Sequence, residues 1–185
     1  CTGKLTVADI GIPKDLVDAL DCPVSTVEAA DVRLPRRPLD AHKGDFGRCA
    51  ILGGCVGYTG APVLAAQAAV RSGAGLVSVG VPTPIWAVAA AKLDEAMPYP
   101  LPAGKEGQLS LEAGEVIHHK LAGCGVCLIG PGLGRGNGVA AVVRHLLHEI
   151  HIPVILDADG INALEGHIDV LDARQGLHTV LTPHD

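Results

Sequence analysis

Aromatic side chains are nearly absent from this 185-residue sequence, which has one Trp, two Tyr and one Phe although 48% of its residues are hydrophobic. A core with so few rings has to be built from Val, Leu, Ile and Ala. Such side chains suit buried parallel strands covered by alanine-rich helices. The length allows one domain with a substantial core and is too short for two ordinary domains. The sequence therefore predicts an α/β domain.

Basic side chains are also scarce, because 14 Lys and Arg stand against 20 Asp and Glu, for a formal net charge of −6. Without a basic stripe, we expect no nucleic-acid partner. No apolar run reaches the roughly 20 residues that a membrane span needs, and no secretory signal is visible. We therefore expect a cytoplasmic protein with no membrane partner. The first residue is Cys1 and not Met, which indicates a cut or processed end.

The six cysteines lack the spacing of a metal centre. Cys124 and Cys127 form a CxxC pair, but no second pair accompanies them, and a structural zinc site needs about four ligands. The histidines do not cluster at ligand spacing, apart from the adjacent His118 and His119. Buried, reduced, cytosolic thiols are the favoured interpretation, and a metal or redox function for the CxxC pair is the alternative.

From residue 48 onward, apolar runs alternate with glycine-rich turns and helical stretches. We expect strands at residues 49–53, 76–81, 125–129, 153–156 and 178–181, and helices at residues 61–71, 85–92, 111–121, 138–150 and 161–164. This alternation predicts a three-layer, Rossmann-like, mostly parallel sheet with helices on both faces. Residues 1–39 differ, with an expected strand at residues 5–12 and a basic linker. We expect an N-terminal arm there and the main domain at residues 40–185.

Ligands bind at the carboxyl ends of the strands in such sheets, and two of these ends are rich in glycine. The turn after the first strand precedes Ala61 and Pro62, which begin a helix, and is compatible with a phosphate or dinucleotide. The turn at residues 130–137 has four glycines, and its Arg135 is placed to face a phosphate group. Its spacing is neither GxGxxG nor a P-loop. Ligand contact is favoured there over a purely structural loop.

Polar side chains follow the next two strands. Asp157 and Asp159 come directly after an apolar run, with Asn162 shortly beyond them. Two carboxylates in this position would hold Mg²⁺ through water. Alternatively, Asp159 caps the following helix, and the residues leave both interpretations open. The last strand runs into Thr182 and His184, which adds a second polar group at the same edge of the sheet.

Five short motifs occur in a characteristic order and spacing. They are His42-Lys43-Gly44-Asp45-Phe46-Gly47-Arg48, Tyr58-Thr59-Gly60-Ala61, Ile129-Gly130-Pro131-Gly132-Leu133-Gly134, Asp157-Ala158-Asp159-Gly160-Ile161-Asn162 and Leu181-Thr182-Pro183-His184. Together they resemble the ADP/ATP-dependent NAD(P)H-hydrate dehydratases, a family of ribokinase-like fold. The resemblance spans about residues 40 to 185.

The resemblance implies a repair enzyme, a carbon–oxygen lyase that acts on hydrated NADH or NADPH. ADP or ATP with Mg²⁺ phosphorylates the C6 hydroxyl of the damaged nicotinamide ring, phosphate leaves, and NAD(P)H is restored. ADP is favoured over ATP, and a homo-oligomer, a tetramer in the family, is expected. The implied substrate contacts are Ala61, Gly132, Gly134 and His184. The implied supporting residues are Lys43, Asp45, Gly54, Gly57, Tyr58, Gly60, Asp157, Asp159, Asn162 and Thr182, and no metal ligand is assigned with certainty.

The family's pattern continues with a Lys-Gly nucleotide-binding element and a Gly-Thr-Gly-Asp turn that supplies its catalytic Asp. Neither occurs in these residues, so we expect a domain that is incomplete at its C-terminus and inactive alone. Residues 5–13 are similar to the segment that closes the epimerase domain in bifunctional forms of the enzyme. Two alternatives remain. One is a ribokinase-like kinase for a vitamin precursor or sugar, and the other is a non-catalytic dinucleotide-binding module.

Overall fold

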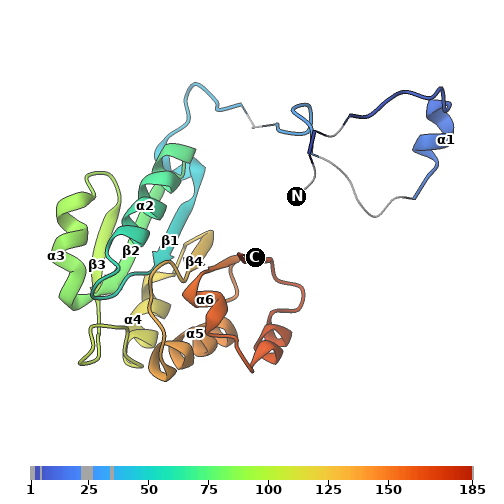
Figure 1. Cartoon of the computed structure of the whole chain (residues 1–185). Coiled ribbons are helices and arrows are strands. Elements are labelled where there is room, and N and C mark those ends of the chain that lie inside the picture. Colours follow the sequence, from blue (N-terminus) through green and yellow to red (C-terminus); the bar gives the residue numbers. More distant parts are fainter. Residues whose placement is uncertain (1–2, 5, 22–26, 34–35, 185) are drawn as a thin grey trace. The chain divides into compact units, whose positions relative to one another are not determined.

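The computed structural model describes residues 3–4, 6–21, 27–33 and 36–184 (Figure 1). Cys1 and Leu5 therefore lie outside the described residues. The chain divides into two compact units, residues 1–39 and residues 40–185. No helix in the described ranges combines the length and apolar character that a bilayer span requires.

The first unit contains one short helix, α1 (Lys14–Asp18), with no buried residue. Residues 6–12 form no strand, so the strand predicted at residues 5–12 is wrong over the part that the structure describes. The backbone N–H of Gly11 donates to Asp9 Oδ1 at 2.8 Å, and this local bond turns the chain. Val7 and Ile10 are 90% and 80% exposed. A local side-chain bond of this kind competes with strand pairing.

The second unit is built on six parallel strands in the order β3-β2-β1-β4-β5-β6. This confirms the predicted α/β class. The strands are β1 (Arg48–Leu52), β2 (Leu76–Pro82), β3 (Met97–Leu101), β4 (Val126–Ile129), β5 (Val154–Asp157) and β6 (Thr179–Thr182). The helices are α2 (Gly60–Ser72), α3 (Thr83–Lys92), α4 (Ala113–Lys120), α5 (Asn137–Glu149) and α6 (Asp159–Asn162), with 3₁₀ turns η1 (Lys43–Phe46) and η2 (Ile168–Arg174).

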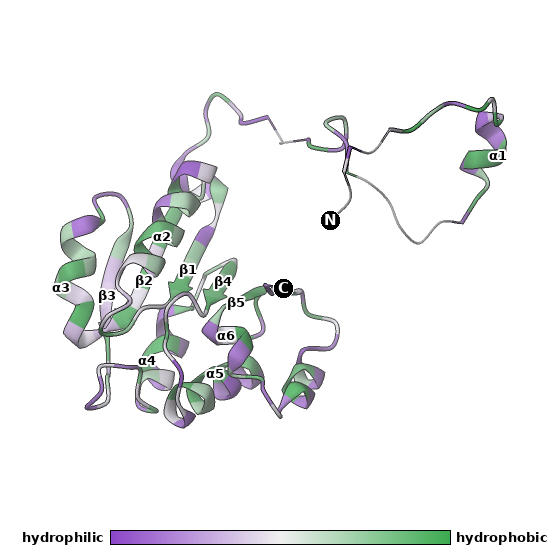
Figure 2. Cartoon of the chain, viewed as in Figure 1, coloured by the Kyte–Doolittle hydropathy of each residue, from purple (hydrophilic) through white to green (hydrophobic). Residues whose placement is uncertain are grey.

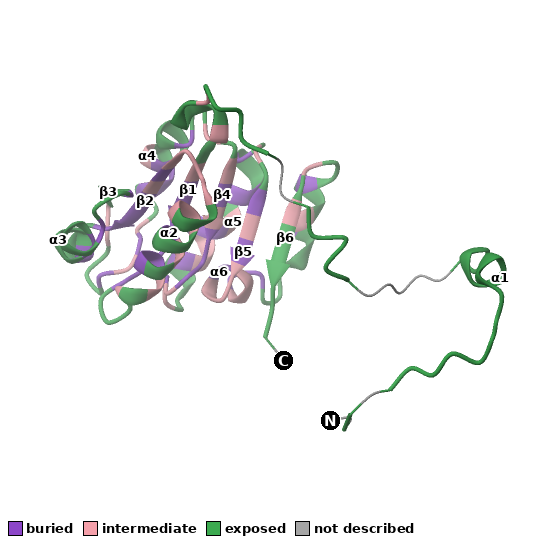
Figure 3. Cartoon of the chain, turned by 90° about the horizontal axis from the view of Figure 1, so that it is seen from above, coloured by how far each residue is buried: buried purple, intermediate pink, exposed green. Residues whose placement is uncertain are grey.

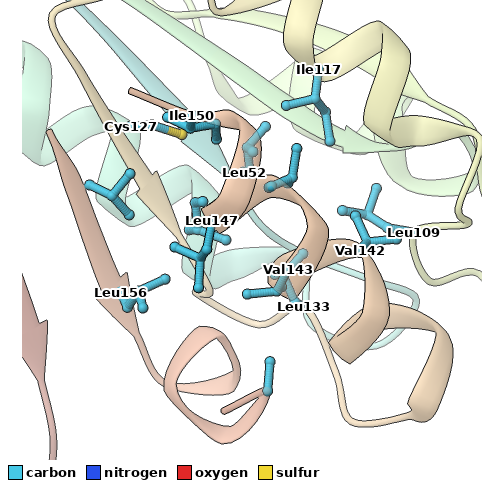
Figure 4. Close-up of a cluster of buried hydrophobic side chains, with 14 of the residues drawn as sticks. Leu52, Leu109, Ile117, Cys127, Leu133, Val142, Val143, Leu147, Ile150 and Leu156 are labelled. Carbon is cyan, nitrogen blue, oxygen red and sulfur yellow. The ribbon is translucent and has the colours of Figure 1, made fainter. Parts of the chain in front are cut away.

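Helices cover both faces of the sheet because successive residues of a strand point to opposite sides. In β1, Ile51 packs in a cluster with α2 and α3, whereas its neighbour Leu52 packs in a cluster with α4 and α5. Figure 4 shows the second cluster, and Figure 2 shows how hydrophobic β1 and β4 are. The buried residues gather in the central strands, and β6 at the sheet edge is largely exposed (Figure 3). The result is the predicted three-layer arrangement.

Strand β3 was not predicted, because its sequence contains Pro98 and Pro100. Proline has no N–H to donate to a neighbouring strand, so within sheets it is confined to edge strands. β3 is such an edge and pairs with β2 alone. The two prolines are two residues apart and therefore point their nitrogens to the same, unpaired side. The indole N–H of Trp86 donates to the Pro98 carbonyl at 3.2 Å and ties α3 to this edge.

Arg174 fixes the other end of the sheet. It is only 3% exposed, and its guanidinium donates to the carbonyls of Ile150 and Ile152 and to Thr179 Oγ1. Burial lowers the pKa of this guanidinium below its usual value. These bonds hold η2 against the starts of β5 and β6. They therefore tie the start of the edge strand β6 to the segment that leads into β5.

Candidate active site at the switch point of the sheet

The strand order reverses at β1. The chain builds outward from β1 through β2 and β3 and then returns to place β4 on the other side of β1. The helix after β1 lies on one face of the sheet, and the helix after β4 lies on the other. Open α/β sheets bind their ligands at such a switch point, beyond the carboxyl ends of the strands. The two glycine-rich turns of the sequence are the loops at this point.

These two loops lie in direct contact. The backbone N–H of Gly54 donates to the Pro131 carbonyl at 2.8 Å, and that of Gly130 donates to the Leu52 carbonyl at 3.0 Å. A Cβ on Gly53 would lie 2.6 Å from the Pro131 oxygen, so a residue with a side chain does not fit there. Leu133, which is fully buried, anchors the second loop in the core beneath α5 (Figure 4).

Three predicted residues meet where the loops touch. Gly132 has φ +67, and a Cβ on it would lie 3.1 Å from the carbonyl oxygen of Tyr58 and 3.3 Å from Cβ of Ala61. Ala61 lies in the first turn of α2, whose free N–H groups and dipole favour an anionic ligand. Small residues keep this part of the backbone accessible. Gly57 and Gly60 belong to the same loop and helix start.

The two aspartates after β5 have separate partners. Asp157 Oδ1 accepts a hydrogen bond from Thr182 Oγ1 at 2.7 Å. Asp159 Oδ2 accepts one from the backbone N–H of Gly134 at 2.9 Å, and its Oδ1 accepts one from Asn162 Nδ2 at 3.1 Å. The amide of Gly134 is thus already engaged within the protein. Ala158 precedes α6, and no side chain caps that helix, so Asp159 is not a helix cap. Through its bond to Gly134, Asp159 instead holds the loop that follows β4 at residues 130–136, called the β4 loop below.

Ala158 separates these aspartates with an unusual backbone conformation, φ 46 and ψ −113. It is the one described residue other than glycine with a positive φ. A residue with a side chain is strained in this region. The backbone conformation of Ala158 changes the direction of the chain between Asp157 and Asp159, so that Asp157 bonds to β6 and Asp159 bonds to the β4 loop.

A pocket of about 260 Å³ extends the site along α5. The residues that line it come from the end of the β4 loop, from α5 and from the segment that starts with α6. They are Gly134, Arg135, Gly136, Asn137, Val139, Ala140, Arg144, Asp159, Asn162, Ala163, Glu165 and His167. The pocket is therefore continuous with the loop that meets Ala61 at the switch point.

Lys43 and Asp45 are not brought to this edge. They belong to η1, where the backbone N–H of His42 donates to Asp45 Oδ2 at 2.9 Å. The backbone N–H of Gly75 donates to the Phe46 carbonyl at 3.2 Å, which places η1 at the amino-terminal ends of β1 and β2. The His42-Lys43-Gly44-Asp45 motif thus lies at the edge of the sheet opposite the loops. His184 follows β6 and is exposed.

Gln108 and Cys55 lie at the site, although no local sequence signal marks either of them. Gln108 Nε2 donates to the Arg135 carbonyl at 3.3 Å, and the neighbouring Gly107 carbonyl accepts from the Val56 N–H at 3.3 Å. The segment between β3 and α4 therefore makes one hydrogen bond with each of the two loops. Cys55 is buried beside Gly134, and burial together with the Asp159 carboxylate raises the pKa of its thiol. This thiol is neutral at ordinary pH.

The CxxC pair lies away from the loops. Cys127 is fully buried in β4, and burial raises the pKa of its thiol well above the usual value. The pKa of Cys124 is raised as well, again by burial. Reactive cysteines are exposed and have a lowered pKa, so these two do not have the character of a redox pair. Among the described residues, no three His, Cys, Asp or Glu side chains gather as a metal site.

A sequence profile described as NAD(P)H-hydrate dehydratase, Carb_kinase, matches residues 49–185. The bifunctional NAD(P)H-hydrate repair enzyme of Moorella thermoacetica is 43% identical over 185 residues, which cover 99% of this chain and 35% of that protein. The ADP-dependent (S)-NAD(P)H-hydrate dehydratase of Lactiplantibacillus plantarum is 32% identical over 161 residues, which cover 86% of this chain and 53% of that protein. The chain thus spans between a third and just over half of the length of these curated relatives.

Solved structures agree. A ribokinase-like superfamily protein of Enterococcus faecalis matches with a TM-score of 0.63 and 27% identity, over 80% of this chain and 49% of that one. An ADP/ATP-dependent NAD(P)H-hydrate dehydratase of Bacillus subtilis, co-crystallised with ATP and Mg²⁺, matches with a TM-score of 0.53 and 29% identity, over 69% of this chain and 42% of that one. These likenesses confirm the ribokinase-like fold. The profile covers well over half of the chain, and the chain therefore belongs to the NAD(P)H-hydrate dehydratase family.

Proposed function

We propose that this chain takes part in the nucleotide-dependent dehydration of hydrated NADH and NADPH, which restores the reduced dinucleotide. The observation that carries the proposal is the meeting of two glycine-rich loops at the switch point, where Gly132 lies against Tyr58 and Ala61. Backbone without bulky side chains lets a dinucleotide approach the N–H groups at the start of α2. The likeness to an NAD(P)H-hydrate repair enzyme and to an NAD(P)H-hydrate dehydratase supports the choice of substrate.

The chemistry explains why a nucleotide is needed. The damaged ring carries a hydroxyl on C6, and hydroxide is a poor leaving group. Transfer of the terminal phosphoryl group of ATP or ADP to this oxygen forms a phosphate ester and releases ADP or AMP. The C6–O bond then breaks with phosphate as the leaving group, the neighbouring carbon loses a proton, and the ring double bond returns. Phosphorylation thus converts loss of water into an easier loss of phosphate.

Asp157 is the described residue that best fits a role toward Mg²⁺, the ion present with the Bacillus subtilis relative. Both oxygens of Asp159 already accept bonds from Gly134 and Asn162. Asp157 uses one oxygen for Thr182, and no described residue donates to its Oδ2. Mg²⁺ is usually held by one or two carboxylates together with substrate phosphates, so a single available oxygen suits it. When bound, the ion offsets charge on the phosphoryl oxygens.

The predicted substrate contacts follow from this geometry as part of the proposal. Ala61 and Gly132 offer close approach to backbone, and Gly134 offers only its carbonyl side, because its N–H is bonded to Asp159. His184 lies after β6 on the same edge of the sheet and supplies a side chain that donates or accepts a hydrogen bond. Lys43 and Asp45 are left with a structural role at the opposite edge.

The test supplies hydrated NADH, Mg²⁺ and either ADP or ATP to the protein, as the 185-residue chain and within the complete reading frame that contains it. We expect the absorbance of reduced nicotinamide to recover in the complete protein only when a nucleotide is present, and faster with ADP. A Gly132→Val variant should lose the recovery, because its side chain fills the space beside Ala61. Absence of recovery, or stable phosphorylation of a vitamin precursor or sugar, would contradict the proposal.

The remaining parts of the proposal concern the protein around the site. Residues 1–39 precede the profile match at residues 49–185, but the match to the bifunctional Moorella enzyme covers 99% of the chain, which supports their expected similarity to the end of an epimerase domain. Cys49, Cys55, Cys124 and Cys127 are free thiols, which supports the cytoplasm as the place of action. The homo-oligomer expected from the family is checked by sedimentation of the purified protein.

A further inference from the structure

The pocket along α5 is lined by two arginines, Arg135 of the loop after β4 and Arg144 of α5. Arg135 is 76% exposed, and its one ionic contact is a distance of 3.9 Å from its Nε to Asp159 Oδ1. Arg144 lies in α5, donates from one nitrogen to the Ala163 carbonyl at 3.0 Å and keeps its other donors. Both line the same pocket of about 260 Å³. One guanidinium is thus held in place, and the other is available to close on a ligand.

We propose that this pocket binds a phosphate group of the dinucleotide substrate, with Arg135 and Arg144 as its cationic contacts. This inference rests on the proposed function. A guanidinium offers parallel N–H groups that match two phosphate oxygens, which makes arginine the usual partner for such groups. Arg135 belongs to the loop whose Gly132 meets Ala61, so a ligand seated at the switch point reaches the pocket along one continuous stretch of backbone.

The carboxylates in the pocket do not cancel this charge equally. Asp159 keeps its charge, but both of its oxygens accept bonds from Gly134 and Asn162, and it lies 3.9 Å from Arg135, so protein groups fix its position. Glu165 is exposed, and its side chain makes no hydrogen bond or ion pair with any residue that the structure describes. It therefore repels an anion in the same pocket. The proposal therefore predicts opposite changes in phosphate affinity. Removal of a guanidinium should weaken binding, and removal of the Glu165 charge should strengthen it.

The experiment titrates the 185-residue chain by calorimetry with ADP-ribose, with ADP-ribose 2′-phosphate and with inorganic phosphate. None of these contains nicotinamide, so binding is measured apart from the reaction. We expect Arg135→Gln and Arg144→Gln each to weaken binding about tenfold, as for the loss of one charged hydrogen bond. Glu165→Gln should strengthen binding about twofold. If only the 2′-phosphorylated ligand responds, the pocket takes the 2′-phosphate, and if both nucleotides respond, it takes the pyrophosphate.

The matched control is Arg71→Gln, an exposed arginine at the end of α2 on the other face of the sheet. It removes the same charge without touching the pocket and should leave the affinity unchanged. Equal losses in Arg71→Gln, Arg135→Gln and Arg144→Gln would reduce the effect to net charge and overturn the proposal, as would unchanged binding in both pocket variants. If arginine-dependent binding persists while the complete protein shows no dehydration, the phosphate site stands and the proposed reaction falls.

Discussion

Replacing Asp159 tests whether one carboxylate holds the β4 loop in place. Asp159→Ala removes the acceptor for the Gly134 N–H and for the Asn162 amide, which lie at 2.9 and 3.1 Å. The Asp159 side chain is only 19% exposed, so water replaces these bonds incompletely. Bonds to a charged group contribute about 1.5–3 kcal/mol each, although the Asn162 amide is half-buried and regains part of its hydration. We expect a loss of about 2–4 kcal/mol in the free energy of unfolding.

The contact with Arg135 adds little to this figure, because the arginine is 76% exposed and 3.9 Å away. Asp159→Asn has nearly the same shape and keeps one acceptor oxygen, so it keeps one of the two bonds, but it loses the charge and puts an NH2 donor where the second acceptor oxygen was. It should therefore cost about half as much as the alanine variant. Urea unfolding measures the order of stabilities, wild type above Asn above Ala, with an unchanged dependence on denaturant.

Asp169→Ala is the control, because Asp169 is exposed in η2 and makes no side-chain bond. A surface change of this kind is usually worth less than about 0.5 kcal/mol. A double-mutant cycle of Asp159→Ala with Asn162→Ala should give a coupling energy above about 0.5 kcal/mol. The reasoning fails if Asp159→Ala costs no more than Asp169→Ala, or if the cycle shows additivity.

Three further results are expected. Gly132→Ala should lower the free energy of unfolding by about 1–2 kcal/mol, because of strain at φ +67, and should also weaken dinucleotide binding. The control Gly176→Ala, at φ +80 in open space, should lose a similar amount of stability and leave binding unchanged. Arg174→Met should lower the free energy of unfolding by about 3 kcal/mol, because the buried acceptors of its three bonds lose their donor. Burial raises the pKa of Cys127 and of Tyr99, so above pH 9.0 the unfolded chain releases protons that the folded chain keeps, and stability should fall as pH rises. Cys127→Val should make that fall shallower in urea unfolding at a series of alkaline pH values; an identical pH dependence in the variant would show that this thiol contributes nothing.

Much of the fold was predictable because its signals are local. The strand expected at residues 76–81 is β2 (Leu76–Pro82), and the helix expected at residues 138–150 is α5 (Asn137–Glu149). Apolar runs bounded by glycine mark buried strands whatever surrounds them. The edge strand β3 escaped because its prolines are tolerated only where no neighbour needs their nitrogens, and position in the sheet is not a local property.

The glycine-rich turns of the candidate site also carry local signals. The glycine turns carry their own conformational requirement, so Gly132 and its neighbours were recognised from sequence. Gln108 and Arg144 were not, because each matters through a contact with a distant segment, 27 and 19 residues away. The order of motifs also did not reveal that Lys43 lies at the opposite edge of the sheet from the others. A sequence motif shows which residues occur along the chain, and only the fold shows where they lie in space.

The segment Asp157-Ala158-Asp159 shows how two adjacent carboxylates come to serve different purposes. In a regular strand their side chains, two residues apart, would share one face and repel each other there. The positive φ of Ala158 breaks that register, so Asp159 turns to the β4 loop and Asp157 stays with Thr182 of β6. One carboxylate accepts bonds through both oxygens and fixes the loop, and the other accepts a bond from Thr182 through one oxygen. The strained residue between them is what gives the two carboxylates partners in different elements, and it leaves Asp157 at the sheet edge for the proposed role toward Mg²⁺.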